Sequence, residues 1–251
     1  MQHFKNKFSD PKTLGTLTNI QKCLRLNDLN EVGDGTHYLT FEMIGLFSFR
    51  EWSVPQTIDF FFTFLNRLNI KVDYVTIHPD KFEEWKVFYS SYKVEIRPDE
   101  SCKWSDGNIG GYCTEFYKNN IEIGNIVNPL GSCIDVGFGL ERLLQVGGGQ
   151  EYLSKLKILE NTCLDLINSG VILGNNKQSY ILKKLITESI LLGSEIKHPF
   201  FNQIRNRQLI NYENYLKNKD KEKYRNKDGV FWLDTFGVDI SKIDLYSKIK
   251  K

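Results

Sequence analysis

The side chains best suited to chemistry at the start of this sequence are an arginine and a histidine on either side of a turn. Arg25 closes a run of strand-forming residues, and His37 opens the next such run after the turn residues 33–35. The two side chains could face one ligand across a hairpin. A guanidinium suits phosphate, because its fork of donors matches two phosphate oxygens. The alternative is an ordinary hairpin with Arg25 in a surface ion pair, and the hairpin alone favours that alternative.

A second arginine, Arg142, follows a Gly-x-Gly turn. Residues 135–144 have the sequence DVGFGLERLL, which predicts a strand end at Asp135, a turn and then a helix. A helix start with an adjacent arginine is a good anion site. No third glycine follows at the offset of a dinucleotide fingerprint. Upstream, Trp104 and the glycines before Glu115 could form the wall of a tight pocket.

The other reactive residues form no recognisable catalytic or metal-binding group. The histidines other than His37 are isolated along the chain. The five cysteines are odd in number and lack C-x-x-C spacing; they are Cys23, Cys102, Cys113, Cys133 and Cys163. We therefore predict no disulfide framework, no metal site and a location in the reducing cytoplasm.

The elements that must position these residues change character at Gly147-Gly148-Gly149, which predicts a loop or hinge. Before it, strand patterns surround one amphipathic helix over 56–68. After it, three helical segments follow, of which the third, 200–228, is polar and basic. We predict an α+β domain, residues 1–146, built on an antiparallel sheet flanked by helices, and a smaller helical domain, residues 147–251.

Charge is nearly balanced over the 251 residues, with 33 Lys and Arg against 31 Asp and Glu. No uncharged apolar run reaches the roughly 18 residues of a membrane span. Residues 177–251 hold 16 basic and 9 acidic residues, and the basic ones are densest over 217–227. Such a segment can contact phosphates. The alternative is a solvated surface kept soluble by lysine.

Five segments, taken in order, resemble the aminoacylation core of the alanyl-tRNA synthetase family, which is of class II. They are QKCLRLNDLNEVG, HYLTFEMIGLFSF, GGYCTEFY, EIGNIV and DVGFGLERLL. The first is similar to the family's motif 2 hairpin and the last to its motif 3. Two later segments, LINSGVILGNNKQSYILKKLI and GVFWLDTFGVDI, look like the tRNA-recognition helices and the segment after them. The resemblance implies ATP and Mg²⁺ as cofactors and a tRNA acceptor stem as partner, with no membrane.

The resemblance also implies roles for individual residues. Arg25 matches the arginine that holds the ATP α-phosphate, and Arg142 matches the one that holds the γ-phosphate. The remaining matches are His37, Glu42, Met43 and Phe47 for the adenine and phosphate side, Trp104, Asn125, Val127 and Asp135 for the alanine pocket, and Asn175 and Asp234 for the acceptor-stem base pair. Asp135 occupies the place that receives the amino-acid ammonium. The alternative for Asp135 is a cap of the following helix.

Several departures from the family leave the acceptor open. The sequence begins where an early family segment would fall, so we expect motif 1 to be missing, along with the editing and C-terminal domains. Asn176 to Ser179 stand where the family has acidic, glycine and arginine residues. Our leading hypothesis is ATP-dependent activation of alanine, or a similar small amino acid, and transfer to tRNA. The alternatives are transfer to a carrier, peptide or small molecule, and a catalytically dead paralogue that binds tRNA or protein.

Overall fold

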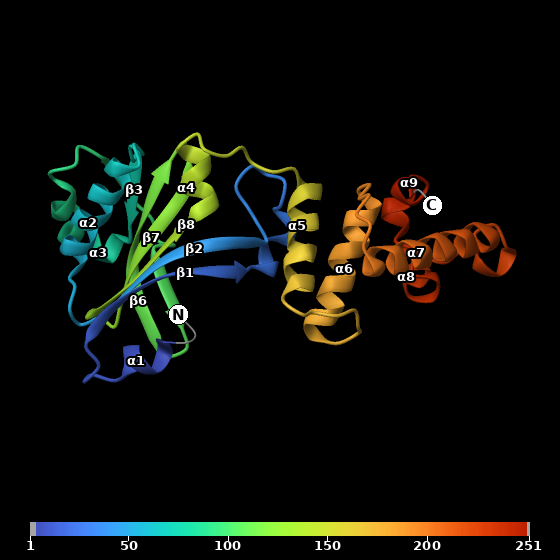
Figure 1. The fold of residues 1–251 in the computed structure, drawn as a ribbon, viewed down its shortest axis with the longest axis horizontal. Coiled ribbons are helices and arrows are strands. Elements are labelled where there is room, and N and C mark those ends of the chain that lie inside the picture. The colour runs from blue at the N-terminus through green and yellow to red at the C-terminus, as the bar shows by residue number, and fades with distance from the viewer. Residues whose placement is uncertain (1–3, 250–251) are drawn as a thin grey trace. The chain divides into compact units, whose positions relative to one another are not determined.

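The computed structural model describes residues 4–249, which contacts divide into two compact units (Figure 1). The first unit comprises Met1–Arg25 and Phe41–Tyr152, and the second comprises Leu26–Thr40 and Leu153–Lys251. Contacts thus group the loop after Arg25 with the later helices, and the predicted boundary after residue 146 stays a prediction. No helix within residues 4–249 is long and apolar enough to cross a membrane.

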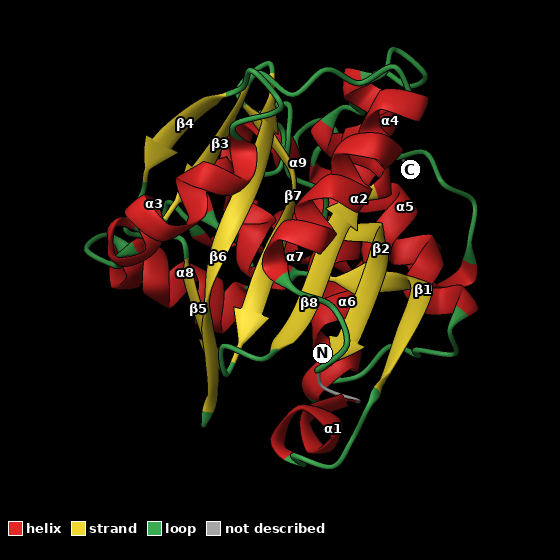
Figure 2. Ribbon diagram, turned by 90° about the vertical axis from the view of Figure 1, so that its left-hand side faces the viewer, coloured by secondary structure: helices red, strands yellow, loops and turns green. Residues whose placement is uncertain are grey.

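The first unit is built on one eight-stranded sheet, seen face-on in Figure 2. The strand order is β1-β2-β8-β7-β6-β3-β4, and β5 pairs with β6. Among the strand pairs with a described register, β3 with β4 is parallel and the rest are antiparallel. The strands are β1 (Gly15–Leu24), β2 (Thr40–Phe49), β3 (Tyr74–Ile77), β4 (Glu95–Pro98), β5 (Lys103–Asp106), β6 (Ile109–Lys118), β7 (Ile121–Pro129) and β8 (Cys133–Gly139). The predicted α+β class with flanking helices is confirmed.

Helices of the first unit cover the sheet because their apolar stripes need a partner. The predicted amphipathic helix is α2 (Val54–Arg67), which starts where the Ser53 hydroxyl accepts the Gln56 N–H. Its buried side chains share the main core with Phe116 and Phe138 of the sheet. The other helices are α1 (Lys5–Ser9), α3 (Pro79–Trp85), the 3₁₀ turn η3 (Lys86–Tyr89) and α4 (Leu140–Val146).

The opposite face of the sheet holds two smaller apolar clusters. Phe8 of α1 packs with Phe47 and Phe49 of β2 in one of them. Leu46, directly before Phe47, belongs to the main core. Successive side chains of β2 therefore alternate between the two faces, as a strand requires. The second face is the one that carries the predicted site.

The second unit is mostly helical, as the sequence predicts. Its elements are η2 (Leu26–Asn30), α5 (Lys155–Asn168), α6 (Lys177–Leu191), α7 (Pro199–Asn218), η4 (Glu222–Tyr224), α8 (Gly229–Phe236), η5 (Ile240–Lys242) and α9 (Ile243–Tyr246). The helical segment expected over 200–228 is shorter than predicted. It ends at Asn218, and a new helix starts where the Asp228 carboxylate accepts the N–H of Phe231.

Candidate functional site

The pairing register brings most of the predicted pocket residues onto one face of the sheet, called here the site face. Residues directly opposite each other on neighbouring strands point to the same face. One row across the sheet is Cys113, Val127, Asp135 and Phe47, and the next is Thr76, Glu115, Asn125, Gly137 and Gly45. Four residues to which the resemblance assigns binding roles, Phe47, Asn125, Val127 and Asp135, therefore lie in two adjacent rows.

Asp135 lies in the middle of β8, so the prediction that it ends the strand is wrong. The strand continues to Gly139, and this glycine, which has no capping side chain, is the N-cap of α4. The alternative that Asp135 caps the helix is therefore wrong as well. Burial raises the pKa of Asp135 to about 6. A buried carboxylate of this kind is suited to pairing with a cationic group.

An apolar wall adjoins Asp135. Val127 is buried with Cys102 and Cys113, and Trp104 packs against these three residues. Phe47 is also buried, with its ring 4.8 Å from that of Phe4. The register places Phe47 opposite Asp135, which groups it with the residues predicted for the amino acid.

Glu42 and Met43 of β2 lie beside the end of β8 and the start of α4. The Glu42 N–H donates to both carboxylate oxygens of Glu141, at 3.0 and 3.1 Å. Met43 lies opposite Gly139, and a Cβ built on Gly137 would lie 3.0 Å from the Met43 Sδ. Burial raises the pKa of Glu141. Glu141, which directly precedes Arg142 on α4, thus contacts the backbone of Glu42.

Glu122 is a site residue that the sequence did not reveal. The Nη1 of Arg142 donates two hydrogen bonds to Glu122, one to its backbone carbonyl at 2.8 Å and one to its carboxylate at 3.1 Å. The Asn125 amide also donates to this carboxylate, at 3.4 Å. Three positions along a strand would normally place Glu122 and Asn125 on opposite faces. A bulge resolves this: the pairing of β6 with β7 skips Ile123, so Glu122 pairs with Tyr117.

Glu115 completes an acidic site face. Its carboxylate accepts hydrogen bonds from the Tyr117 hydroxyl at 2.8 Å and the Thr76 hydroxyl at 3.4 Å. Burial, and then the charge of Glu122, raise the pKa of Glu115. Carboxyl groups with raised pKa values in one place are typical of functional sites, and here they favour a cationic ligand.

Arg25 and His37 lie in different units. Arg25 is exposed and directly follows β1 in the first unit. His37 belongs to the second unit, where its Nδ1 lies 2.6 Å from the Asp34 carboxylate and its Nε2 lies 3.3 Å from Glu31. Burial opposes ionisation of Asp34, yet hydrogen bonds from Thr36 and His37 hold its pKa well below the usual range. Acidic neighbours thus orient the imidazole.

The residues predicted to contact tRNA are exposed and belong to the second unit. Asn175 precedes α6 and accepts a hydrogen bond from Lys183 at 3.2 Å, and Asp234 lies on α8. All six basic side chains of the 217–227 segment are exposed. Two of them lie over aromatic rings, Lys223 over Tyr224 at 4.7 Å and Lys227 over Phe231 at 5.2 Å.

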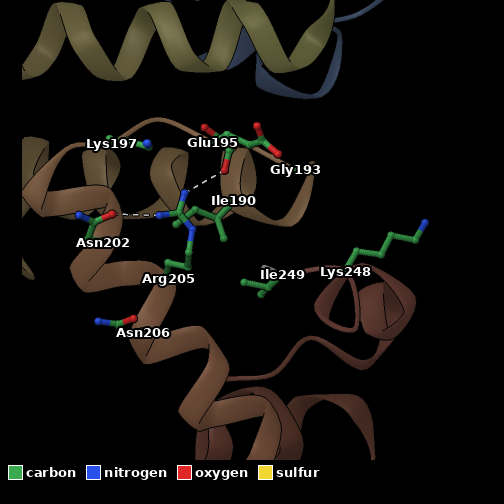
Figure 3. A pocket seen from close by; sticks show the side chains of 10 residues that line it. Ile190, Gly193, Glu195, Lys197, Asn202, Arg205, Asn206, Lys248 and Ile249 are labelled. Atoms are coloured by element: carbon green, nitrogen blue, oxygen red, sulfur yellow. Dashed lines mark hydrogen bonds between the residues drawn. The ribbon is translucent and has the colours of Figure 1, made fainter. Parts of the chain in front are cut away.

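The second unit also contains a cavity of about 540 Å³ that no predicted residue lines (Figure 3). Arg205 extends into it and donates to the Ser194 carbonyl at 2.9 Å and to Asn202 at 3.0 Å. Lys197, Lys248 and Glu195 contribute further charges to the lining. The cavity is therefore positively charged on balance.

Comparisons with known proteins point to one family. Residues 1–125 match the family model described as tRNA synthetases class II (A). The alanine–tRNA ligase of Wolbachia pipientis wMel is 30% identical over 74% of this chain and 29% of its own length. The enzymes of the same name from Chromohalobacter salexigens and Ehrlichia ruminantium are 26% and 27% identical, over 81% and 74% of this chain. The chain spans 32% and 29% of these two relatives, or about a third or less of each.

Proposed function

We propose that this chain, which belongs to the class II tRNA synthetase family, activates a small amino acid such as alanine with ATP and Mg²⁺ and transfers it to a tRNA acceptor end. The observation that carries the proposal is the site face. Its rows bring Asn125, Val127 and Asp135 of the neighbouring strands β7 and β8 together with Phe47 of the sequence-distant strand β2. Arg142 adjoins them through Glu122. The resemblance assigns each of these residues, except Glu122, to the binding of either the amino acid or ATP.

The amino acid is bound by charge and by size. Asp135 supplies an anion for the ammonium group, since a buried charge is costly unless it is paired. Val127 and Trp104 form the apolar wall that contacts a short side chain. Asn125, held by Glu122 at 3.4 Å, offers an amide for the polar end of the ligand.

Adenylate formation needs little besides positioned positive charge. An oxygen of the amino-acid carboxylate attacks the α-phosphorus and forms a bond to it. The bond from this phosphorus to the β-phosphate oxygen breaks, and pyrophosphate leaves. Two anions approach each other, and Arg25 and Arg142 stabilise the charge that builds on the phosphates. Glu122 positions Arg142 by an ion pair and a carbonyl bond. No nucleophile or general base is required of the protein.

The carboxylates beside Arg142 fit Mg²⁺. This ion is usually held by one or two carboxylates together with substrate phosphates. Glu141 is the first candidate, because it directly precedes Arg142 on α4, and Glu42 is the second, because its charge interacts with that of Glu141. Bound Mg²⁺ would neutralise phosphate charge there.

Exposed residues of the second unit support tRNA as the acceptor of the activated amino acid. The exposed 217–227 segment supplies six basic side chains for phosphate contact, and Asn175 and Asp234 are the proposed readers of the acceptor base pair. Charging of a tRNA with a G·U acceptor pair should exceed charging of its G·C variant. Equal activity on both, or none on either, would favour a carrier, peptide or small molecule as acceptor.

Ligand binding tests the proposal before any acceptor is known. Non-hydrolysable aminoacyl-sulfamoyl adenosines contact both halves of the pocket, and a ligand present at 100 times its Kd stabilises a protein by about 2.7 kcal/mol. We expect the alanyl compound to raise the Tm most among small amino acids, and ATP with Mg²⁺ to raise it as well. A folded chain that responds to neither would be a dead paralogue.

A further inference from the structure

Two cysteines and a glutamate come together on the site face, although ten residues separate the cysteines in sequence. The ligand atoms of Cys102, Cys113 and Glu115 all lie within 4.8 Å of one another. Strand pairing causes this arrangement, because the Cys113 N–H donates to the Cys102 carbonyl at 2.9 Å next to the β5–β6 ladder. The two cysteines are 0% and 3% exposed. Cys113 and Glu115, two residues apart on β6, share a face.

The neighbouring hydroxyls hold these groups in place. The Cys102 thiol donates to the Thr76 hydroxyl at 3.0 Å, and Thr76 in turn donates to Glu115 at 3.4 Å. Tyr117 donates to the same carboxylate oxygen of Glu115, at 2.8 Å. Partners of this kind orient ligands in metal sites, and their loss typically weakens metal binding by about 10–100-fold. The cluster therefore has ligands and supporting groups.

The donor set selects a class of ion. Thiolates favour Zn²⁺ and other soft ions, whereas Mg²⁺ and Ca²⁺ prefer oxygen ligands alone. Three protein ligands with one further position for water or substrate is a common arrangement for Zn²⁺. A cation here would also offset the acidic charge that Glu115 and Glu122 place on this face.

We propose that Cys102, Cys113 and Glu115 bind one thiophilic divalent cation of the Zn²⁺ type beside the amino-acid pocket. Val127 and Trp104 contact the cysteines, so the ion adjoins the residues proposed to bind the amino acid. Its remaining coordination position is available to water or to a lone-pair donor of a small ligand, such as an amine or a hydroxyl. The Mg²⁺ carboxylates Glu42 and Glu141 are not part of this site.

Metal content and spectroscopy test the proposal without any measurement of amino-acid activation. The full chain, purified under reducing conditions, is loaded with Zn²⁺ and dialysed, and its metal-to-protein ratio is measured. We expect one Zn²⁺ per chain, and a thiolate-to-cobalt charge-transfer band when Co²⁺ replaces Zn²⁺. Cys102→Ser and Cys113→Ser should each weaken Zn²⁺ binding roughly tenfold or more, and Glu115→Gln should weaken it less.

Cys133→Ser is the matched control, because Cys133 is buried in the same unit but outside the cluster. It should bind Zn²⁺ as the unaltered chain does. The cobalt band of the unaltered chain reports thiolate ligation even if a cysteine variant fails to fold. The proposal is overturned if the unaltered chain retains no Zn²⁺, if binding survives both cysteine substitutions, or if the reduced preparation yields a Cys102–Cys113 disulfide and no metal.

Discussion

At the scale of single residues, burial and function act on Asp135 in opposite directions. Its pKa is about 6 in the folded chain against an ordinary value of 3.8. Between these two pH values only the folded state keeps the proton, so this residue's contribution to stability falls as pH rises. Above pH 6 the buried, ionised Asp135 lowers the free energy of unfolding by its full amount, on the order of 3 kcal/mol at most. A bound ammonium would offset it.

Asp135→Asn separates these effects. Removing the buried charge should leave the free energy of unfolding at pH 7 unchanged or higher, and should abolish the loss of stability between pH 4 and 6. The same variant should bind ATP normally and lose amino-acid affinity by about 1.5–3 kcal/mol, the range for a charged hydrogen bond. Urea unfolding and ligand titration measure the two quantities.

Asp59→Asn is the control for that prediction, since Asp59 is an exposed acidic residue of α2 in the same unit, away from the site face. It should retain the amino-acid affinity. The assignment of the ammonium site fails if Asp59→Asn weakens amino-acid binding as much as Asp135→Asn does.

Glu122 is a positioning residue, so its effect should appear through Arg142. Glu122→Gln keeps the carbonyl bond to Arg142 and the size of the side chain, but removes the ion pair. Because the pair is partly exposed, we expect a loss of about 1 kcal/mol in transition-state stabilisation, seen as a higher KM for ATP. Glu95→Gln, which breaks the exposed ion pair with Arg97, should leave the KM for ATP unchanged. An unaltered KM in Glu122→Gln would contradict the positioning role.

At the scale of elements, close strand packing explains why position 124 is a glycine. A Cβ on Gly124 would lie 2.4 Å from the Phe138 ring and 2.7 Å from the Gly137 carbonyl, whereas the nearest atom to a Cβ on Gly139 is 3.7 Å away. Gly124→Ala should therefore lower the free energy of unfolding by about 1–3 kcal/mol, measured in urea. Gly139→Ala should cost less. Equal losses would contradict the described packing of β7 against β8.

The sequence predicts the elements better than it predicts the site face. Apolar periodicity is sufficient to locate α2 and the strands that begin near Ile121 and Cys133, because each buries a continuous apolar face. It cannot predict the bulge at Ile123, which depends on pairing with β6 and brings Glu122 to Arg142. It also misses the Cys102 and Cys113 cluster, because cross-strand pairing, and not local spacing, joins the two cysteines.

At the scale of the whole molecule, the two units divide the proposed work between a pocket and a basic surface. Lys219 and Lys223 are exposed in the 217–227 segment, and each phosphate contact releases counterions. The double variant Lys219→Gln and Lys223→Gln should weaken tRNA binding and reduce the slope of log K against log salt by about 1–2. The exposed Lys12 and Lys71 of the first unit, changed likewise, should leave the slope unaltered. Filter binding across a salt series measures both, and an equal slope in the two variants would contradict a role for this segment.

The central claim is that the site face supports attack of an amino-acid carboxylate on ATP. Amino-acid-dependent exchange of labelled pyrophosphate into ATP measures this step without tRNA. We predict exchange with alanine, weaker exchange with glycine and serine, and a loss of about 10²–10³-fold in Arg142→Ala, the range for removal of one preorganised donor. No exchange with any small amino acid, in a folded chain that binds ATP with Mg²⁺, would contradict it.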